Sequence, residues 1–253
     1  MDIATIAGMV LGIGAVIISY LMEGGSIAAV LQIPAMILVI CGTIGAATIT
    51  TSLDTLKNIP NLIKISLFGK MDEPLELISK IVAMAEKARR EGILGLESDL
   101  KAASNPFLKK AIQLVIDGTE VTALRNILET EMAYISERHK TGQTFFSKLG
   151  GFSPTLGIIG TVLGLINTLA NTEDASKMAE KIASAFIATL WGVSLANLVY
   201  LPIGDKLKYR NEEEMKSLEL IIEGVISIQS GENPRIIKTK LLSFVTPSIR
   251  KED

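Results

Sequence analysis

Charge is missing from four long stretches of this 253-residue sequence. No Lys or Arg occurs before Lys57, and no charged side chain lies in residues 3–22, 26–53, 149–172 or 182–204. Each stretch has about 20 residues or more, which is enough for a helix to cross a bilayer. Charge that is segregated in this way excludes an ordinary soluble globule, and it indicates a membrane protein with a charged soluble part.

Cysteine and histidine are nearly absent, with one residue of each, Cys41 and His139. A single cysteine excludes a disulfide framework, and these two residues cannot supply the ligand set that a protein zinc site needs. Because Cys41 lies inside an apolar run, we expect a packed thiol without a chemical role.

The sequence also lacks the motifs of common enzymes. No glycine-rich phosphate loop, zinc-ligand spacing, nucleophile elbow or paired-carboxylate arrangement stands out. The net charge of -2 comes without a basic patch, so nucleic acid is not expected as a partner. We therefore expect a protein that is not an enzyme and that holds no cofactor or metal.

The distribution of Lys and Arg predicts the orientation in the membrane. The turn after the first apolar run has neither residue, and the connector after the third run has only Lys177 and Lys181. Because positive charge stays on the cytoplasmic side, both termini and the charged insertion are expected there. The first run lacks the basic residues that precede a cleaved signal peptide, so it is expected to be retained as a membrane helix.

These features predict an all-α membrane protein with four membrane-spanning helices and a helical cytoplasmic domain inserted between the second and the third. The expected parts are membrane helices 1 and 2 in residues 1–53, the cytoplasmic domain in 54–147, membrane helices 3 and 4 in 148–204, and a cytoplasmic helix and tail in 205–253. Separate helices are expected in residues 119–140 and 149–172, and a last charged helix in 205–230.

Small and hydroxyl-bearing residues recur at helical spacing in the third and fourth runs. Gly157, Gly160 and Gly164 leave one face of the third helix without bulk, which helix packing alone can explain. Thr161 lies beside that face, and Thr189 lies on a small face of the fourth helix. Each threonine could bond to a carbonyl of its own helix, or the two could line a path for a small cation.

A path for protons or sodium usually needs an anionic or titratable group at membrane depth. None of the four charge-free runs contains Asp, Glu, Lys, Arg or His. If ions move through this protein, the carboxylate must come from another polypeptide. The sequence thus predicts a partner helix that lies against the small-residue surface.

Together these motifs resemble the MotA family of flagellar motor stator subunits. The resemblance rests on the two-plus-two arrangement of apolar runs and on residues 88–97, 154–164 and 189–192 followed by Pro202, and it covers nearly the whole chain. It implies a homo-oligomer, a pentamer, that surrounds a MotB dimer in the bacterial inner membrane. MotB supplies the transmembrane Asp, and the transported ion is a proton or sodium.

The resemblance also implies roles for residues of the two last runs. Thr189 matches a threonine that is found widely in the family. Thr161 stands where proton-driven members often carry alanine and sodium-driven members threonine, which favours sodium, because hydroxyl oxygens can replace part of its hydration shell. Pro154 and Pro202 match the family's prolines and are expected to act as hinges, since proline removes a helix hydrogen bond.

In the charged insertion, the resemblance implies contact with the rotor protein FliG. Arg89 and Glu97 match the family's rotor-contact charges, although the adjacent Arg90 leaves the register open. Glu131 falls near a third such charge. Considered without the resemblance, these residues are typical of a solvated helix surface.

Two other functions stay open on the sequence alone. An energy-transducing subunit like ExbB or TolQ would share the ion path, but such proteins usually have one span fewer. A structural membrane scaffold without ion flow would need neither Thr161 nor Thr189.

Overall fold

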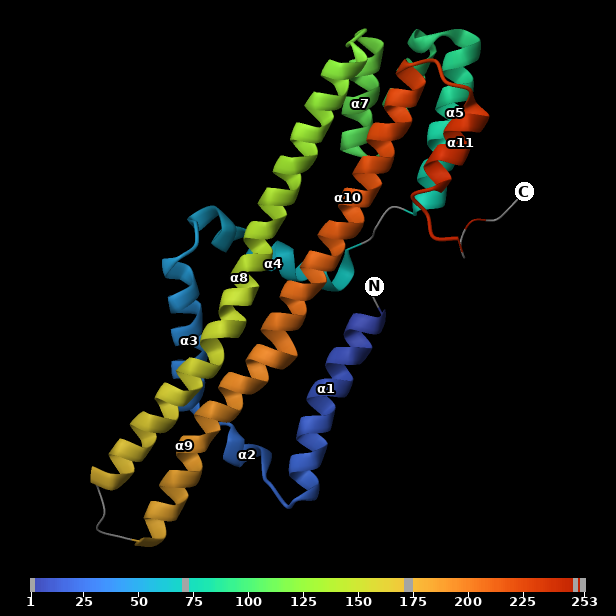
Figure 1. Cartoon of the computed structure of the whole chain (residues 1–253). Coiled ribbons are helices and arrows are strands. Elements are labelled where there is room, and N and C mark those ends of the chain that lie inside the picture. Colours follow the sequence, from blue (N-terminus) through green and yellow to red (C-terminus); the bar gives the residue numbers. More distant parts are fainter. Residues whose placement is uncertain (1–2, 70–72, 171–174, 248–249, 251–253) are drawn as a thin grey trace. The chain divides into compact units, whose positions relative to one another are not determined.

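The computed structural model describes residues 3–69, 73–170, 175–247 and 250. Every regular element in these residues is helical, which confirms the all-α prediction (Figure 1). In chain order the elements are α1 (Ile3–Met22), α2 (Ile27–Val30), α3 (Ile33–Ile49), α4 (Leu53–Phe68), α5 (Pro74–Glu91), the 3-10 helix η1 (Ile93–Leu96), α6 (Glu97–Ala102), α7 (Pro106–Ile116), α8 (Val121–Ala170), α9 (Ala175–Leu195), the π-helix η2 (Ala196–Tyr200), α10 (Leu201–Gln229) and α11 (Pro234–Leu242).

The chain divides into two compact units. The first comprises Met1–Lys70 and His139–Tyr209, and the second comprises Met71–Arg138 and Arg210–Asp253. The helices α8 and α10 contribute residues to both units.

The helix α8 is longer than the sequence predicted. It runs for 50 residues without a break, so the expected separation between residues 140 and 149 is wrong. Gly142 is the one glycine in that interval, and no proline interrupts it. A Cβ on Gly142 would lie 2.8 Å from the Leu62 side chain, so this glycine allows close packing and does not end the helix. In the same way, α9, η2 and α10 follow one another without a gap and end at Gln229. The sequence predicted that a new helix begins at residue 205, and this prediction is wrong.

The second apolar run is broken into the single turn α2 and the 17-residue α3, with Gln32 in an extended conformation between them. Pro34 lies in the first turn of α3, where its missing N–H costs no helical hydrogen bond, so the helix begins here. By length and composition, α1, α8 and the continuous α9–α10 helix each contain a stretch that can cross a membrane, whereas α3 is shorter.

One face of α3 is fully covered by protein. Val39, Thr43 and Ala47 recur every four residues on this face and are 0% exposed. Cys41 is two residues from both Val39 and Thr43, which places it on the opposite face, and it is exposed. The expectation of a packed thiol is therefore wrong, because the chain buries the face of α3 that carries Val39, Thr43 and Ala47 and leaves the Cys41 side exposed.

The core of the first unit holds α3 and α4 against the part of α8 and α10 that belongs to this unit. It contains Phe145 and Phe146, whose rings meet edge to face with centroids 5.7 Å apart, and Leu62 of α4. Lys148 donates hydrogen bonds to the carbonyl of Thr50 at 3.2 Å and to its hydroxyl at 3.0 Å. This cation satisfies the C-terminal end of α3 and its dipole.

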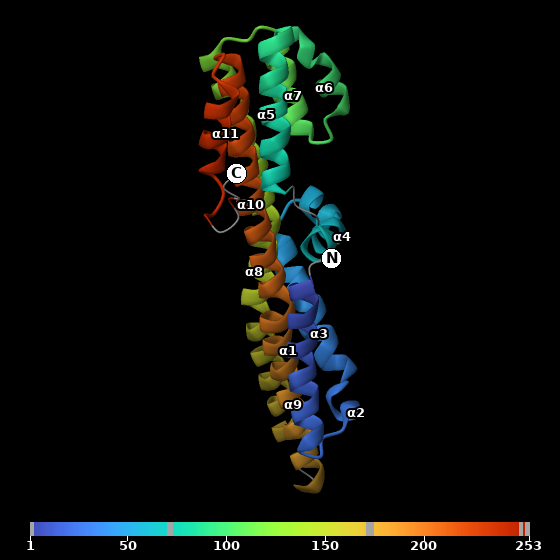
Figure 2. The ribbon, with the colours of Figure 1, turned by 90° about the vertical axis from the view of Figure 1, so that its right-hand side faces the viewer.

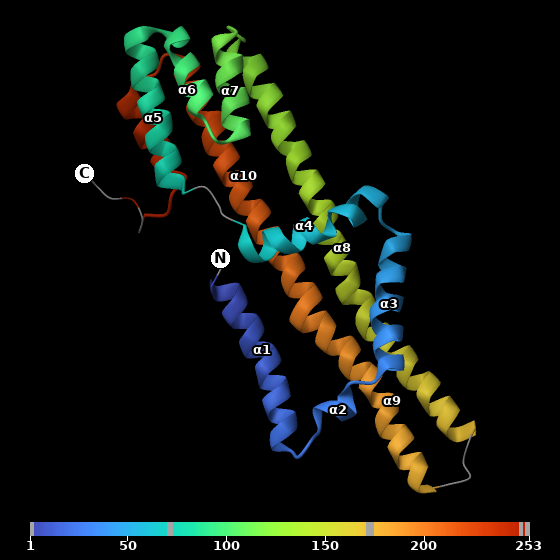
Figure 3. The ribbon, with the colours of Figure 1, turned by 180° about the vertical axis from the view of Figure 1, so that it is seen from behind.

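By contrast, α1 has no buried residue. It lies alongside η2 (Figures 2 and 3), where a Cβ on Gly12 would come within 3.3 Å of the Leu198 side chain.

The second unit has a larger apolar core of its own. Ile81 of α5, Leu124 of α8, Ile221 of α10 and Ile237 of α11 are all 0% exposed within it. The helix α11 packs against α5 (Figure 2). Asn105 caps α7 by accepting hydrogen bonds from the first main-chain N–H groups of that helix, so this helix end is satisfied locally.

Glu223 joins α8, α10 and α11 in this unit. Its carboxylate is 3.1 Å from Arg125 and also pairs with Lys240, and its side chain is 19% exposed. Burial by itself raises the pKa of Glu223, but hydrogen bonds from the two cations outweigh it, so the pKa lies below its ordinary value. The pKa of Lys240 is raised in turn by its hydrogen bond to Glu223.

Glu223→Gln is expected to lower the free energy of unfolding by about 1–3 kcal/mol near neutral pH, because it removes a charge that two cations face. A lowered carboxyl pKa contributes stability that is present above about pH 4.5, the ordinary value, and is lost as pH falls through the native value. The measurement is thermal unfolding of the full chain in detergent at neutral and acid pH. Glu129→Gln, which removes a more exposed partner of Arg125, is the control. A deficit for Glu223→Gln that does not shrink on acidification contradicts this account.

Candidate functional site

Glycine lets α8 and α9 approach each other within the first unit. A Cβ on Gly157 would lie 2.8 Å from the carbonyl oxygen of Ala188 and 3.0 Å from the Cα of Thr189. A Cβ on Gly192 would lie 2.6 Å from the carbonyl oxygen of Ser153. These contacts are to main-chain atoms, so the two backbones touch and no larger residue fits at either position.

This contact between α8 and α9, called the seam below, continues through pairs of glycine and alanine. A Cβ on Gly160 would lie 2.6 Å from the Cβ of Ala188, and one on Gly164 would lie 2.6 Å from the Cβ of Ala185. The glycine face of the third apolar run thus packs against the small face of the fourth run, so the expectation that a helix of another polypeptide lies against this face is wrong.

This close approach brings Thr161 and Thr189 together. Their hydroxyl oxygens are 2.5 Å apart. The Thr161 hydroxyl also lies 3.2 Å from the Gly157 carbonyl oxygen of its own helix and 3.0 Å from the Ala185 carbonyl oxygen of α9. The Thr189 hydroxyl lies 3.3 Å from the Gly157 carbonyl oxygen, across the seam. Thr161 is therefore within hydrogen-bond distance of its own helix and of the neighbouring helix, and its place on a cation path stays a prediction.

Four neutral oxygen atoms converge at this point, two from hydroxyls and two from main-chain carbonyls. Each hydroxyl has one proton to donate and two lone pairs, so accepting capacity is left over after both protons are placed. Neutral oxygens of this kind can replace part of the hydration shell of a small cation. No Asp, Glu, Lys, Arg or His occurs in residues 149–172 or 182–204 to carry a charge beside them.

Thr168 behaves differently. Its hydroxyl is buried and donates to the Gly164 carbonyl oxygen of its own helix at 2.8 Å. For this threonine the bond within the helix is a sufficient explanation.

Both predicted hinge prolines lie inside helices. Pro202 follows η2, the π-helical turn in which the Leu201 N–H bonds to the Ala196 carbonyl. Proline has no N–H and its ring crowds the carbonyl four residues earlier, and a wider turn before it relieves that crowding. Pro154 lies in α8 beside Ser153, whose buried hydroxyl donates to the Gly192 carbonyl oxygen at 2.9 Å. The helical path is therefore irregular before Pro202, whereas α8 stays α-helical at Pro154, and motion about either proline stays a prediction.

Sequence reasoning missed the contacts that hold α9 to the start of α3. The Trp191 indole N–H donates to the Val30 carbonyl oxygen at 2.8 Å, and the Ser184 hydroxyl donates to the Gln32 side-chain oxygen. Val30 and Gln32 lie at the break between α2 and α3, so no helical periodicity could have matched them to α9. The Ser153 hydrogen bond was missed as well, and its only sequence signal is a serine before a proline.

The expected rotor-contact residues lie in the second unit. Arg89 in the last turn of α5 and Glu97 at the start of α6 are both exposed, and η1 joins them at one end of the unit (Figure 2). Glu131 of α8 is half-buried and forms an ion pair with Lys110 of α7 at 2.6 Å. The structure thus places Arg89 and Glu97 in the two helices that η1 joins, and it gives Glu131 a partner within the unit.

Comparison with known proteins agrees with this arrangement. Residues 99–220 match the MotA/TolQ/ExbB proton channel family, and residues 6–92 match the family described as Motility protein A N-terminal. The chain belongs to the MotA/TolQ/ExbB proton channel family. Motility protein A of Borreliella burgdorferi is 34% identical to it over 252 residues, which cover 100% of this chain and 97% of that protein.

Solved structures place this member of the MotA/TolQ/ExbB family close to the MotAB complexes. The C. jejuni MotAB structure is similar to it with a TM-score of 0.94 and 30% identity, covering 100% of both chains. The flagellar MotAB stator complex from Bacillus subtilis is similar with a TM-score of 0.91 and 31% identity, covering 96% of each chain. These matches, with the one to the Motility protein A N-terminal family, confirm the predicted resemblance to MotA and favour it over ExbB or TolQ.

Proposed function

We propose that this chain is a stator subunit of the flagellar motor, which forms an ion channel with MotB and couples ion flow to torque on FliG. The observation that carries the proposal is the meeting of the Thr161 and Thr189 hydroxyls, 2.5 Å apart, in a membrane segment that has no acid of its own. The full-length similarity to MotAB complexes supports MotB as the source of that acid.

The proposed topology has four spans, α1, α3, the apolar part of α8 and the apolar part of α9–α10. The 17 residues of α3 lie at the short end of the roughly 17–25 residues that span a bilayer as a helix. The distribution of Lys and Arg supports cytoplasmic positions for residues 54–147, residues 205–253 and both termini, in the bacterial inner membrane.

The force-generating step in this proposal is neutralisation of the MotB Asp by the arriving ion. Loss of that charge removes the cost of holding it against an apolar surface, so the preferred position of the MotB helix along the ring changes. A homopentamer of this chain then shifts relative to the MotB dimer. Pro154 and Pro202 are the positions at which α8 and α10 can bend, and the second unit presents Arg89 and Glu97 to FliG.

Swimming speed against external sodium tests the function and the ion together. The chain and its MotB partner replace the stators of a host strain, and the membrane potential is held constant. Thr161 adds a hydroxyl to the four oxygen atoms that converge between α8 and α9. We therefore expect swimming speed to rise with the sodium concentration and to stay unchanged when an uncoupler removes the pH gradient. If swimming speed does not depend on the sodium concentration and falls when the uncoupler is added, the transported ion is the proton. Complete loss of motility in the presence of assembled complex contradicts the stator function.

Combining Arg89→Glu with Glu97→Lys is expected to reduce swimming at least several-fold while leaving assembly with MotB unchanged. Both side chains are exposed, so reversing them costs the fold little but inverts the charges offered to a partner. Swimming speed and co-purification with MotB are the two measurements.

The control is Glu76→Lys, at the other end of α5, where the residue forms only an exposed pair with Lys80. Wild-type swimming by the double variant removes Arg89 and Glu97 from the rotor contact.

A further inference from the structure

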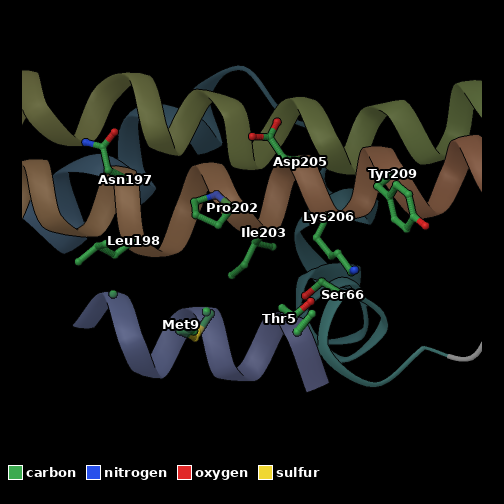
Figure 4. Close-up of a pocket in the computed structure, with 13 residues that line it drawn as sticks. Thr5, Met9, Ser66, Asn197, Leu198, Pro202, Ile203, Asp205, Lys206 and Tyr209 are labelled. Atoms are coloured by element: carbon green, nitrogen blue, oxygen red, sulfur yellow. The ribbon is translucent and has the colours of Figure 1, made fainter. Parts of the chain in front are cut away.

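A cavity of about 460 Å³ lies in the first unit between α1, α4 and the η2–α10 segment (Figure 4). Small residues of α1, Ala4, Gly8 and Gly12, form one wall. Leu198 and Pro202 lie on the opposite wall. The cavity therefore persists because this wall of α1 carries little side-chain bulk, and it lies beside the irregular turn before Pro202.

The two ends of this cavity differ in polarity. Lys206, Tyr209 and Ser66 gather at one end, whereas Met9 and Leu198 lie toward the other, where the Asn197 amide points away from α1 and donates to the Val193 carbonyl oxygen (Figure 4). The Lys206 ammonium lies 4.9 Å from the centroid of the Tyr209 ring, which keeps the cation at that end.

Asp205 also lines the cavity, but its carboxylate lies on the side of α10 away from α1 (Figure 4). The charge that faces α1 across the cavity is therefore that of Lys206.

The polar end also lies at the expected depth of lipid headgroups. Lys206 is the first cation after the charge-free run of residues 182–204. Lysine and tyrosine at the end of an apolar segment are typical of the membrane–water interface, where lipid phosphates lie. An amphipathic occupant with an anionic head matches both ends of the cavity.

Size distinguishes the candidate occupants. An α-helix with side chains is about 10 Å across, so a volume of 460 Å³ holds only about one turn of it. If a methylene takes up about as much space as a water molecule, roughly 30 Å³, the same volume holds a chain of about 15 methylenes. The cavity thus has room for at least one acyl chain.

We propose that this cavity binds an anionic phospholipid, with an acyl chain against Gly8 and Met9 and the phosphate beside Lys206 and Tyr209. The lipid fills the space between α1 and Pro202 that protein side chains leave empty. The proposal depends on insertion of the chain in a membrane and does not depend on ion flow.

Native mass spectrometry of the full chain, purified with its MotB partner in mild detergent, tests this binding. The probes are phosphatidylglycerol and phosphatidylcholine with identical acyl chains. We expect phosphatidylglycerol to be retained about fivefold more strongly, because one lysine contributes about 1 kcal/mol to the binding of anionic lipid. Equal retention of the two lipids by the wild-type complex overturns the proposal.

Matched variants separate this site from lipid bound elsewhere on the surface. Lys206→Gln is expected to abolish the preference for phosphatidylglycerol, whereas Lys208→Gln, an exposed lysine that does not line the cavity, keeps it. Gly8→Leu fills the cavity and is expected to release one lipid of either kind. Gly14→Leu is its control, because a Cβ at either glycine meets nothing within 4 Å but only Gly8 lines the cavity.

If Gly8→Leu and Gly14→Leu retain the same amount of lipid, the lipid does not bind in this cavity. Because retention is measured without motility, a failure of lipid binding and a failure of the stator function give different results.

Discussion

Gly157→Ala is expected to abolish swimming. The added methyl group would lie 2.8 Å from the Ala188 carbonyl oxygen and 3.0 Å from the Thr189 Cα, and main-chain atoms in a packed seam cannot rotate away. The helices must separate, at a cost of roughly 1–3 kcal/mol. That movement also disrupts the contact between the Thr161 and Thr189 hydroxyls. Swimming speed and the thermal unfolding of the purified complex are the measurements.

Gly151→Ala is the control for this substitution. It adds the same methyl group to α8, where nothing lies within 4 Å, so speed and unfolding temperature are expected to stay near the wild-type values.

The packing of α8 against α9 also predicts that a second substitution can compensate for a first one. Gly160→Ala would place two Cβ atoms 2.6 Å apart, and Ala188→Gly removes one of them. The double variant is therefore expected to recover most of the stability that Gly160→Ala loses. Normal swimming by Gly157→Ala, or no recovery in the Gly160–Ala188 pair, shows that α8 and α9 do not pack through these residues.

Thr189→Val is expected to reduce swimming more than tenfold while the complex still assembles. Valine keeps the branched shape, but it removes the hydroxyl that meets Thr161 and the Gly157 carbonyl oxygen across the seam. An ion at this point loses a ligand and an apolar methyl group takes its place, which raises the cost of dehydration. Sodium-dependent swimming speed and recovery of the complex with MotB give the two readouts.

Thr155→Val supplies the comparison for Thr189→Val. The Thr155 hydroxyl is exposed and donates to the Phe152 carbonyl oxygen of its own helix at 2.7 Å, so its loss is expected to leave swimming unchanged. Unimpaired motility of Thr189→Val favours the scaffold function, in which neither hydroxyl touches an ion.

Local patterns in the sequence were enough to predict several features of this protein. The charge-free runs predicted the apolar helices, because a span of hydrocarbon tolerates few charges whatever the tertiary contacts are. Thr161 and Thr189 could be selected because helical periodicity places each on a small face. Their contact with each other, at 2.5 Å, depended on the register between α8 and α9, which no single helix determines.

Helix boundaries were predicted less well, for a physical reason. A glycine such as Gly142 reads as a weak helix former in a sequence, yet here it serves the approach of Leu62 and the helix continues. The π-helical turn before Pro202 was not anticipated either, since several helix hydrogen-bond patterns can accommodate a proline and packing selects among them.

The sequence by itself determined that this protein is helical, that it carries apolar stretches without an acid, and which threonines, prolines and surface charges are candidates for function. Periodicity and charge act within one helix, so neighbouring residues contain that information. Only the tertiary structure decided which backbones touch, that Glu131 pairs with Lys110, that Trp191 reaches Val30, and that a cavity remains beside α1. Each of these depends on residues far apart in the chain, and only the packing of whole helices brings them together.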